Sequence, residues 1–260
     1  MVILWCLLVA QLFIVGESNQ LLRIVNGEQA KQEQFPYLVG LNIASKIPFQ
    51  DSWCGGSIIS DEWILTAAHC IKLLQGKITV SYGSENKNNA KLLTVEEKYI
   101  YRHPKFRKIF HNNFRHDIAL IHTPKMKFND KIQSIPLPSP LNGKRWTKPG
   151  TSVIAAGWGS AVLNGNVVDR LNWVKLEILD VSKCEREYGN VEGKLCVSTD
   201  KKKSVCSGDS GGPLVPEDEN KLIGITSFVS STGCDSGKPV AFTNVIDYLD
   251  WIESVSGVKP

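Results

Sequence analysis

Short apolar runs separated by turn residues recur along most of this chain, and they constrain its fold more than any other feature. Turn material such as Gly83-Ser84, 148–150 and 164–166 lies between the runs. Short strands at this spacing are typical of an all-β sandwich or barrel rather than of alternating βαβ units. The β-branched runs include residues 78–80, 118–121, 151–155, 222–226 and 241–245.

One helix is expected near the C-terminal end of the sequence. Ile246, Leu249, Ile252 and Val255 recur at helical spacing, with acidic residues between them. A proline-rich stretch at 135–140 is a candidate crossing between two halves of the chain.

The first residues are typical of an export signal. Residues 2–15 are apolar apart from Gln11, and the small residues Gly16 and Ser18 follow. A run of about 14 apolar residues is too short for a transmembrane helix but suits a signal-peptide core. We therefore predict a signal peptide at 1–18 and a secreted, extracellular protein without a membrane partner. A buried N-terminal helix is the alternative interpretation.

Cysteine usage agrees with export. One of the seven cysteines, Cys6, lies in the signal and would leave with it. An even number in an exported chain predicts three disulfides, although six cysteines allow 15 pairings. A zinc site is the competing interpretation, but no C-x-x-C pair occurs, so we expect neither a metal nor another cofactor. The remaining six are Cys54, Cys70, Cys184, Cys196, Cys206 and Cys234.

Charge says little about partners. A formal net charge of +4 over 260 residues neither demands nor excludes an acidic partner, and we expect no nucleic-acid binding. The segment 101–116 is rich in Arg, Lys and His. Binding of an acidic polymer is one interpretation of this segment; a solvated loop is the preferred one, because the charges alternate with Phe and Ile.

Three separated segments carry the residues of nucleophilic catalysis. A serine hydroxyl needs a base to remove its proton, an imidazole suits that task near neutral pH, and a carboxylate can orient the imidazole. Alone, each segment could hold a surface histidine, a turn aspartate or a flexible glycine turn; together, in one exported chain, they are far more specific. They are Leu-Thr-Ala-Ala-His-Cys at 65–70, His-Asp-Ile-Ala-Leu at 116–120 and Cys-Ser-Gly-Asp-Ser-Gly-Gly-Pro at 206–213.

These segments resemble those of the chymotrypsin–trypsin–elastase family of serine proteases, and the resemblance covers nearly the whole chain from Ile24 onward. It implies two six-stranded antiparallel β-barrels, a cleft between them that holds the active site, and a C-terminal α-helix. The peptidase domain would span 24–260, with the N-terminal barrel at 24–135 and the C-terminal barrel and helix at 136–260.

The resemblance also implies a role for each residue of the site. His69 would be the general base and then the general acid, Asp117 would orient it, and Ser210 would form the acyl-enzyme. The N–H groups of Gly208 and Ser210 would make the oxyanion hole. Ser227 matches the family's serine that hydrogen-bonds the triad aspartate. The implied disulfides are Cys54–Cys70, Cys184–Cys196 and Cys206–Cys234.

The sequence Arg23-Ile24-Val-Asn-Gly resembles the family's activation site. The resemblance implies an activation propeptide at 19–23 and a zymogen that a trypsin-like protease cleaves after Arg23. The freed amine of Ile24 would turn inward and pair with Asp209, because a buried carboxylate without a cation is costly.

Matching of the pocket segments places Ser204 at the floor of the specificity pocket, where trypsin-like members carry an aspartate. Val229 and Val240 match the walls and would narrow the slot, so we expect cleavage after small or medium apolar side chains. The stretch 233–242 is similar to insect and crustacean chymotrypsin-like enzymes, elastase-like and collagenolytic ones included.

The resulting expectation is a digestive or tissue-degrading endopeptidase for which collagen is one candidate substrate. Expected partners are protein or peptide substrates, the activating trypsin-like protease and protein protease inhibitors, and the expected state is a monomer. Two alternatives stay open: a selective cascade protease, and a non-catalytic homologue that only binds proteins.

Overall fold

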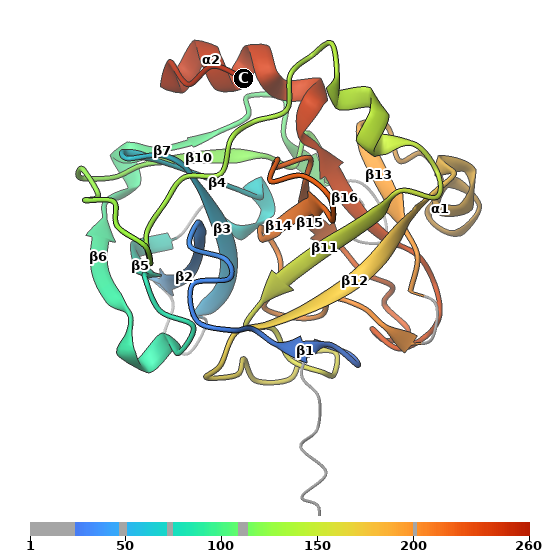
Figure 1. Ribbon diagram of the computed structural model, residues 1–260, viewed down its shortest axis with the longest axis horizontal. Coiled ribbons are helices and arrows are strands. Elements are labelled where there is room, and N and C mark those ends of the chain that lie inside the picture. Colours follow the sequence, from blue (N-terminus) through green and yellow to red (C-terminus); the bar gives the residue numbers. More distant parts are fainter. Residues whose placement is uncertain (1–23, 47–50, 72–74, 109–113, 200–201) are drawn as a thin grey trace, which may run out of the picture.

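The computed structural model describes residues 24–46, 51–71, 75–108, 114–199 and 202–260 (Figure 1). The predicted signal peptide at 1–18 and propeptide at 19–23 lie outside the described residues. Within the part that is described, no helix is long and apolar enough to cross a membrane.

Most of the first half of the chain forms one antiparallel sheet of seven strands. Their turns are short, so neighbours along the chain such as β2 (Leu38–Ser45), β3 (Ser52–Ser60) and β4 (Trp63–Thr66) pair with one another. In spatial order the strands are β6 (Lys91–Val95), β5 (Gln75–Tyr82), β2 (Leu38–Ser45), β3 (Ser52–Ser60), β4 (Trp63–Thr66), β10 (Ala119–His122) and β7 (Ile100–Arg102). A separate two-stranded ribbon joins β8 (Arg107–Lys108) to β9 (Phe114–Arg115).

The second half of the chain forms a closed barrel. An additional pairing of β12 with β13 joins the two ends of a six-stranded sheet, and β1 (Glu28–Gln29) adds to it from the N-terminal part of the chain. In order around the barrel the strands are β12 (Asn172–Leu179), β11 (Ser152–Gly157), β14 (Pro213–Pro216), β15 (Gly224–Phe228), β16 (Val240–Asn244) and β13 (Lys194–Val197).

The mainly β architecture with a C-terminal helix is confirmed, but the two halves differ in closure. Among the described residues, the edge strands β6 and β7 of the first sheet do not pair, so this half is an open sheet rather than a closed six-stranded barrel. β7 is only three residues long, and Pro104, which lacks an N–H donor, follows it closely. The predicted division at 135 and 136 falls in the connection between β10 and β11.

Two α-helices are described. The predicted one is α2 (Leu249–Ser256), preceded by the 3-10 turn η7 (Val245–Tyr248). Its buried residues Leu249 and Ile252 belong to the same apolar core as the first sheet, so α2 ties the end of the chain to that sheet. α1 (Val181–Tyr188) was not anticipated; Asp180 caps it by accepting a hydrogen bond from the Ser182 N–H.

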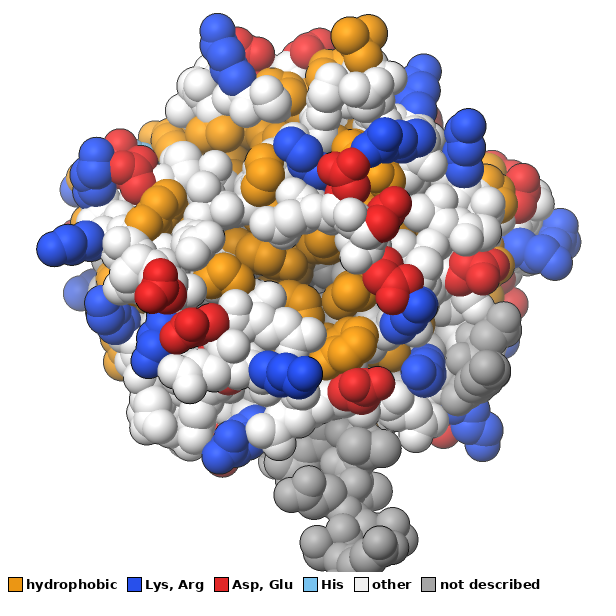
Figure 2. Space-filling view, in the orientation of Figure 1, with side chains coloured by type: hydrophobic (Ala, Val, Ile, Leu, Met, Phe, Trp, Pro, Cys, Tyr) orange, Lys and Arg blue, Asp and Glu red, His pale blue; other side chains and the backbone are white. Residues whose placement is uncertain are grey.

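The remaining helical elements are single 3-10 turns. Among the described residues they include η1 (Ala68–Cys70), η2 (Lys87–Asn89), η3 (Glu97–Tyr99) and η5 (Gly143–Thr147). The two sheets lie beside each other in Figure 1, with α2 across one end. Figure 2 shows basic and acidic side chains interspersed over the same face and hydrophobic side chains gathered toward its centre, so no field of a single sign covers it.

Candidate active site

Strand pairing brings His69 and Asp117 together. His69 lies in η1, directly after β4, and Asp117 lies just before β10. β4 and β10 are antiparallel neighbours with Ala119 opposite Thr66, so the end of one strand meets the start of the other. The His69 Nδ1 and Asp117 Oδ2 atoms are 2.8 Å apart, and the His69 main-chain N–H donates to Asp117 Oδ1 over 2.8 Å.

Asp117 is completely buried, and its oxygens are nevertheless well supplied with donors. Ser227 Oγ donates to Oδ2 over 2.5 Å, and Thr243 Oγ1 donates to the Asp117 main-chain oxygen over 2.9 Å. Burial raises the pKa of the Asp117 carboxyl group. The His69 charge and hydrogen bond, the Lys194 charge and the Ser227 hydrogen bond together outweigh burial and hold this pKa below its usual range.

The main chain of Ser210 lies against the segments that lead to His69. Its carbonyl oxygen accepts a hydrogen bond from the Gly55 N–H over 2.7 Å. At the next residue, Gly211 has a φ of +79°, and a Cβ there would stand 2.2 Å from Thr66 Oγ1. Among the described residues no hydrogen bond joins the Ser210 hydroxyl to the His69 ring; such bonds are often long until a substrate binds.

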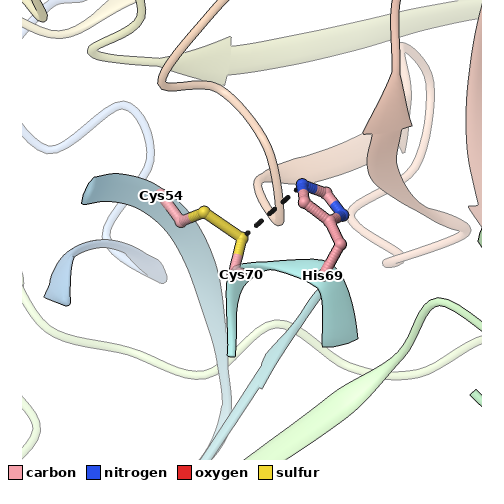
Figure 3. A group of neighbouring side chains, drawn as sticks. All are labelled: Cys54, His69 and Cys70. Atoms are coloured by element: carbon pink, nitrogen blue, oxygen red, sulfur yellow. Dashed lines mark hydrogen bonds between the residues drawn. A yellow bond between two sulfur atoms is a disulfide. The ribbon is translucent and has the colours of Figure 1, made fainter. Parts of the chain in front are cut away.

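A disulfide lies close to the His69 ring. Cys54 in β3 is bonded to Cys70, whose Sγ lies 3.9 Å from His69 Nε2 (Figure 3). The ligand atoms of Cys54, His69 and Cys70 lie within 4.8 Å of one another, the spacing of a metal site. Both sulfurs are already in the disulfide, so neither is a thiolate that could hold a metal. On the other side the His69 ring stacks on Phe114, with ring centroids 4.8 Å apart.

All three disulfides that the family resemblance implied are present. The Cα atoms of Cys54 and Cys70 are 6.3 Å apart. A second bridge joins α1 to β13, with Cα atoms 5.7 Å apart, and a third joins the Ser210 loop to the loop at residue 234, with Cα atoms 5.5 Å apart. The latter two are Cys184–Cys196 and Cys206–Cys234.

The loop around Ser210 offers free backbone donors. The N–H groups of Gly208 and Ser210 donate to no other group in the described part of the chain. Gly208 has a φ of +97°, and a Cβ on it would lie 2.6 Å from Val167 Cγ1, so both the conformation and the space require glycine. Two such donors beside a nucleophile are what a developing oxyanion needs.

Asp209, between Gly208 and Ser210 in the chain, is buried. Its carboxylate accepts hydrogen bonds from the N–H groups of Gly159, over 2.8 Å, and Cys206, over 2.9 Å. Burial raises the pKa of Asp209 to about 7, and the two N–H groups only partly oppose that shift. Within the described part of the chain, no cation contributes to the pKa of this carboxylate.

The described residues of the predicted activation site pack against the segment that precedes the Ser210 loop. Ile24 is completely buried, in the same apolar cluster as Val205. Val25 forms two main-chain hydrogen bonds with Ser204, of 3.0 and 3.2 Å. Val25 is thus anchored two residues before Cys206, whose N–H donates to Asp209. Arg23 itself lies outside the described residues.

The predicted specificity residues are buried or half-buried. Ser204 is fully buried, and its hydroxyl donates to the Val205 carbonyl over 2.8 Å. Val240 is 1% exposed and lies in the same cluster as Val205, and the half-buried Val229 packs against that cluster.

Sequence reasoning missed two residues of this site, Lys194 and Thr243. Both lie behind Asp117, and Lys194 contacts residues 33 and 49 positions further along the chain. No local motif marks them; a lysine at the start of an otherwise apolar strand is the only signal that the sequence offers.

Comparison with known proteins agrees with this geometry. The trypsin family profile matches residues 24–252. Serine protease 1 of Drosophila melanogaster is 38% identical over 238 residues, covering 91% of this chain and 87% of that protein. A collagenase of Hypoderma lineatum is 40% identical over 244 residues, covering 91% of this chain and 88% of that protein. The solved structure of HL collagenase superposes with a TM-score of 0.82 at 37% identity, covering 91% of this chain and all of that one.

Proposed function

Because the chain belongs to the trypsin family of serine proteases, we propose that it is an endopeptidase that cleaves proteins through an acyl-enzyme formed on Ser210. The observation that carries this proposal is the bond between His69 Nδ1 and the buried Asp117 carboxylate, with the Ser210 main chain held against the same strands.

The mechanism follows from the donors and acceptors present. A carboxylate only accepts, so the His69 Nδ1 atom that faces Asp117 carries the proton, and Nε2 is left as the base. Nε2 takes the Ser210 proton as the hydroxyl oxygen attacks the substrate carbonyl, and the imidazolium then protonates the leaving amine. The free N–H groups of Gly208 and Ser210 stabilise the negative oxygen of the tetrahedral intermediate.

We further propose that the protein is made with a signal peptide and is secreted as a zymogen. Cleavage after Arg23 gives Ile24 a free amine, and Asp209 is a buried carboxylate that a cation would stabilise. Pairing of the two would keep Asp209 turned inward and hold the donors of Gly208 and Ser210 in place.

Protein substrates are proposed to present small or medium apolar side chains before the cleaved bond. Support comes from the buried Ser204, which brings no carboxylate for a substrate Lys or Arg, and from the packing of Val229 and Val240. The relative from Hypoderma lineatum is named a collagenase, so collagen is a substrate to test first.

Labelling with a phosphonate reagent that reacts with activated serines tests the catalytic assignment. After trypsin cleavage at Arg23, the protein should take up one equivalent of reagent, and Ser210→Ala should take up none. Ser254→Ala, at an exposed serine on α2, is the matched control and should label normally. A cleaved protein that never labels would support the non-catalytic binding protein instead.

Profiling on a peptide library tests the specificity assignment. The double variant Val229→Gly, Val240→Gly should raise kcat/KM for Phe relative to Val before the cleaved bond by about 10-fold or more, since each methylene is worth roughly 1–3 kcal/mol. Val162→Gly, at an exposed valine, is the control. An unchanged ratio would show that the two valines do not line the pocket.

A further inference from the structure

A lysine is buried behind the catalytic carboxylate. Lys194 begins β13 and is only 7% exposed. Its ammonium donates to Ser227 Oγ over 3.0 Å and to Thr243 Oγ1 over 2.9 Å. The register of the barrel sets this position, because Lys194 and Thr243 are directly opposite each other on β13 and β16. A charged group is rarely placed in such an interior without a partner of opposite charge.

Both hydroxyls that accept from Lys194 donate in turn to Asp117. Ser227 donates to the carboxylate and Thr243 to the main-chain oxygen of the same residue. An ammonium only donates, and each hydroxyl has a single hydrogen, so the direction of both chains of hydrogen bonds is determined. Lys194 therefore polarises two donors toward Asp117 and is separated from it by one hydroxyl on each route.

The charges around this network identify the carboxylate that balances the lysine. Burial lowers the pKa of Lys194 to about 8, and the attraction of Asp117 opposes that shift. Lys194 is therefore positively charged at pH 5–7. His69 and Lys194 are the charged groups that act on Asp117. The phenol of Tyr248 also lies near: burial, then Asp247, then Asp117 and Glu192 raise its pKa to about 12, so it stays neutral.

We propose that Lys194 is a positioning residue of the catalytic triad, whose ammonium acts through Ser227 and Thr243 to balance the Asp117 carboxylate. A positive charge behind Asp117 makes a second positive charge on His69 less favourable. The inference rests on the proposed function, because it concerns the same base.

The test is the pH profile of kcat/KM on a peptide substrate, measured with the Arg23-cleaved protein. Lys194→Met removes both charge and hydrogen bonds, whereas Lys194→Gln keeps a donor but no charge. We expect the acid limb of the profile to move to higher pH by about 0.5–1 unit in both variants. KM should change little. Lys183→Met, on the exposed face of α1, should leave the profile unchanged.

The outcomes separate this inference from the proposed function. Serine labelling that fails in the unsubstituted protein overturns the proposed function and with it this inference. If the unsubstituted protein labels normally and the folded variants have the same acid limb in their kcat/KM profiles as the unsubstituted protein, only the role of Lys194 is overturned. A purely structural role would lower kcat equally at every pH. If both variants fail to fold, NMR titration of Lys194 Nζ decides, since a lysine that is neutral at pH 5–7 contradicts the proposal.

Discussion

The protein uncleaved at Arg23 should lose stability as pH rises, because Asp209 is a buried carboxylate that no cation among the described residues balances. Its pKa is about 7 in the folded protein against an ordinary value of 3.8. Between these values the folded form binds more protons than the unfolded form, so the free energy of unfolding falls with increasing pH. A difference of about 3 units corresponds to about 4 kcal/mol over the full window.

Cleavage after Arg23 is the perturbation that should remove this loss. The amine of Ile24 would become a cation, and its proposed pairing with Asp209 would keep the carboxylate ionised in the folded state. Both forms are prepared with Ser210→Ala to prevent self-digestion. Urea unfolding is then measured at several pH values from about 4 to about 7.5. The cleaved form should show a much smaller decline than the uncleaved form.

The control is Asp209→Asn in the uncleaved form, since an amide cannot titrate. At acid pH its free energy of unfolding should be lower than that of the unsubstituted uncleaved protein, because the amide group satisfies one of the two N–H donors less well. Its pH dependence should nevertheless lack the decline that Asp209 causes. Parallel pH dependences of the uncleaved protein and this variant would refute the reasoning.

Two further substitutions test the packing of the site. Gly159→Ala should lower the free energy of unfolding, measured in urea, by about 3 kcal/mol or more, because the new Cβ would stand 2.3 Å from Asp209 Oδ2. Gly76→Ala is the control and should change this free energy little, because the atom nearest to its new Cβ would be 3.4 Å away. Removal of the Cys54–Cys70 bridge by a double alanine substitution should cost about 3 kcal/mol in a calorimetric scan and also reduce kcat. Double alanine substitution of Cys184–Cys196 is the matched control, which should lose similar stability but retain kcat. Equal losses of kcat in the two variants would contradict a specific role of the Cys54–Cys70 bridge.

Local patterns in the sequence were sufficient for much of this protein. Strand periodicity and turn residues predicted the β architecture, and the apolar spacing near residue 250 predicted α2. The His69, Asp117 and Ser210 segments are each continuous in the chain, so the residue types that catalysis needs could be recognised without coordinates. The disulfide pairs, in contrast, followed from the family resemblance, because the cysteine count alone allows 15 pairings.

Tertiary structure alone decided how the first sheet ends and what lies behind Asp117. Whether β6 and β7 meet depends on the length and twist of several strands, which no single segment encodes. Lys194, Ser227 and Thr243 come together because β16 pairs with both β13 and β15, and the β15–β16 register shifts between Thr226 and Phe228, where Ser227 lies. A different register would turn side chains to the opposite face of the sheet. Contacts between residues dozens of positions apart are set by that register, whereas a motif records only neighbours along the chain.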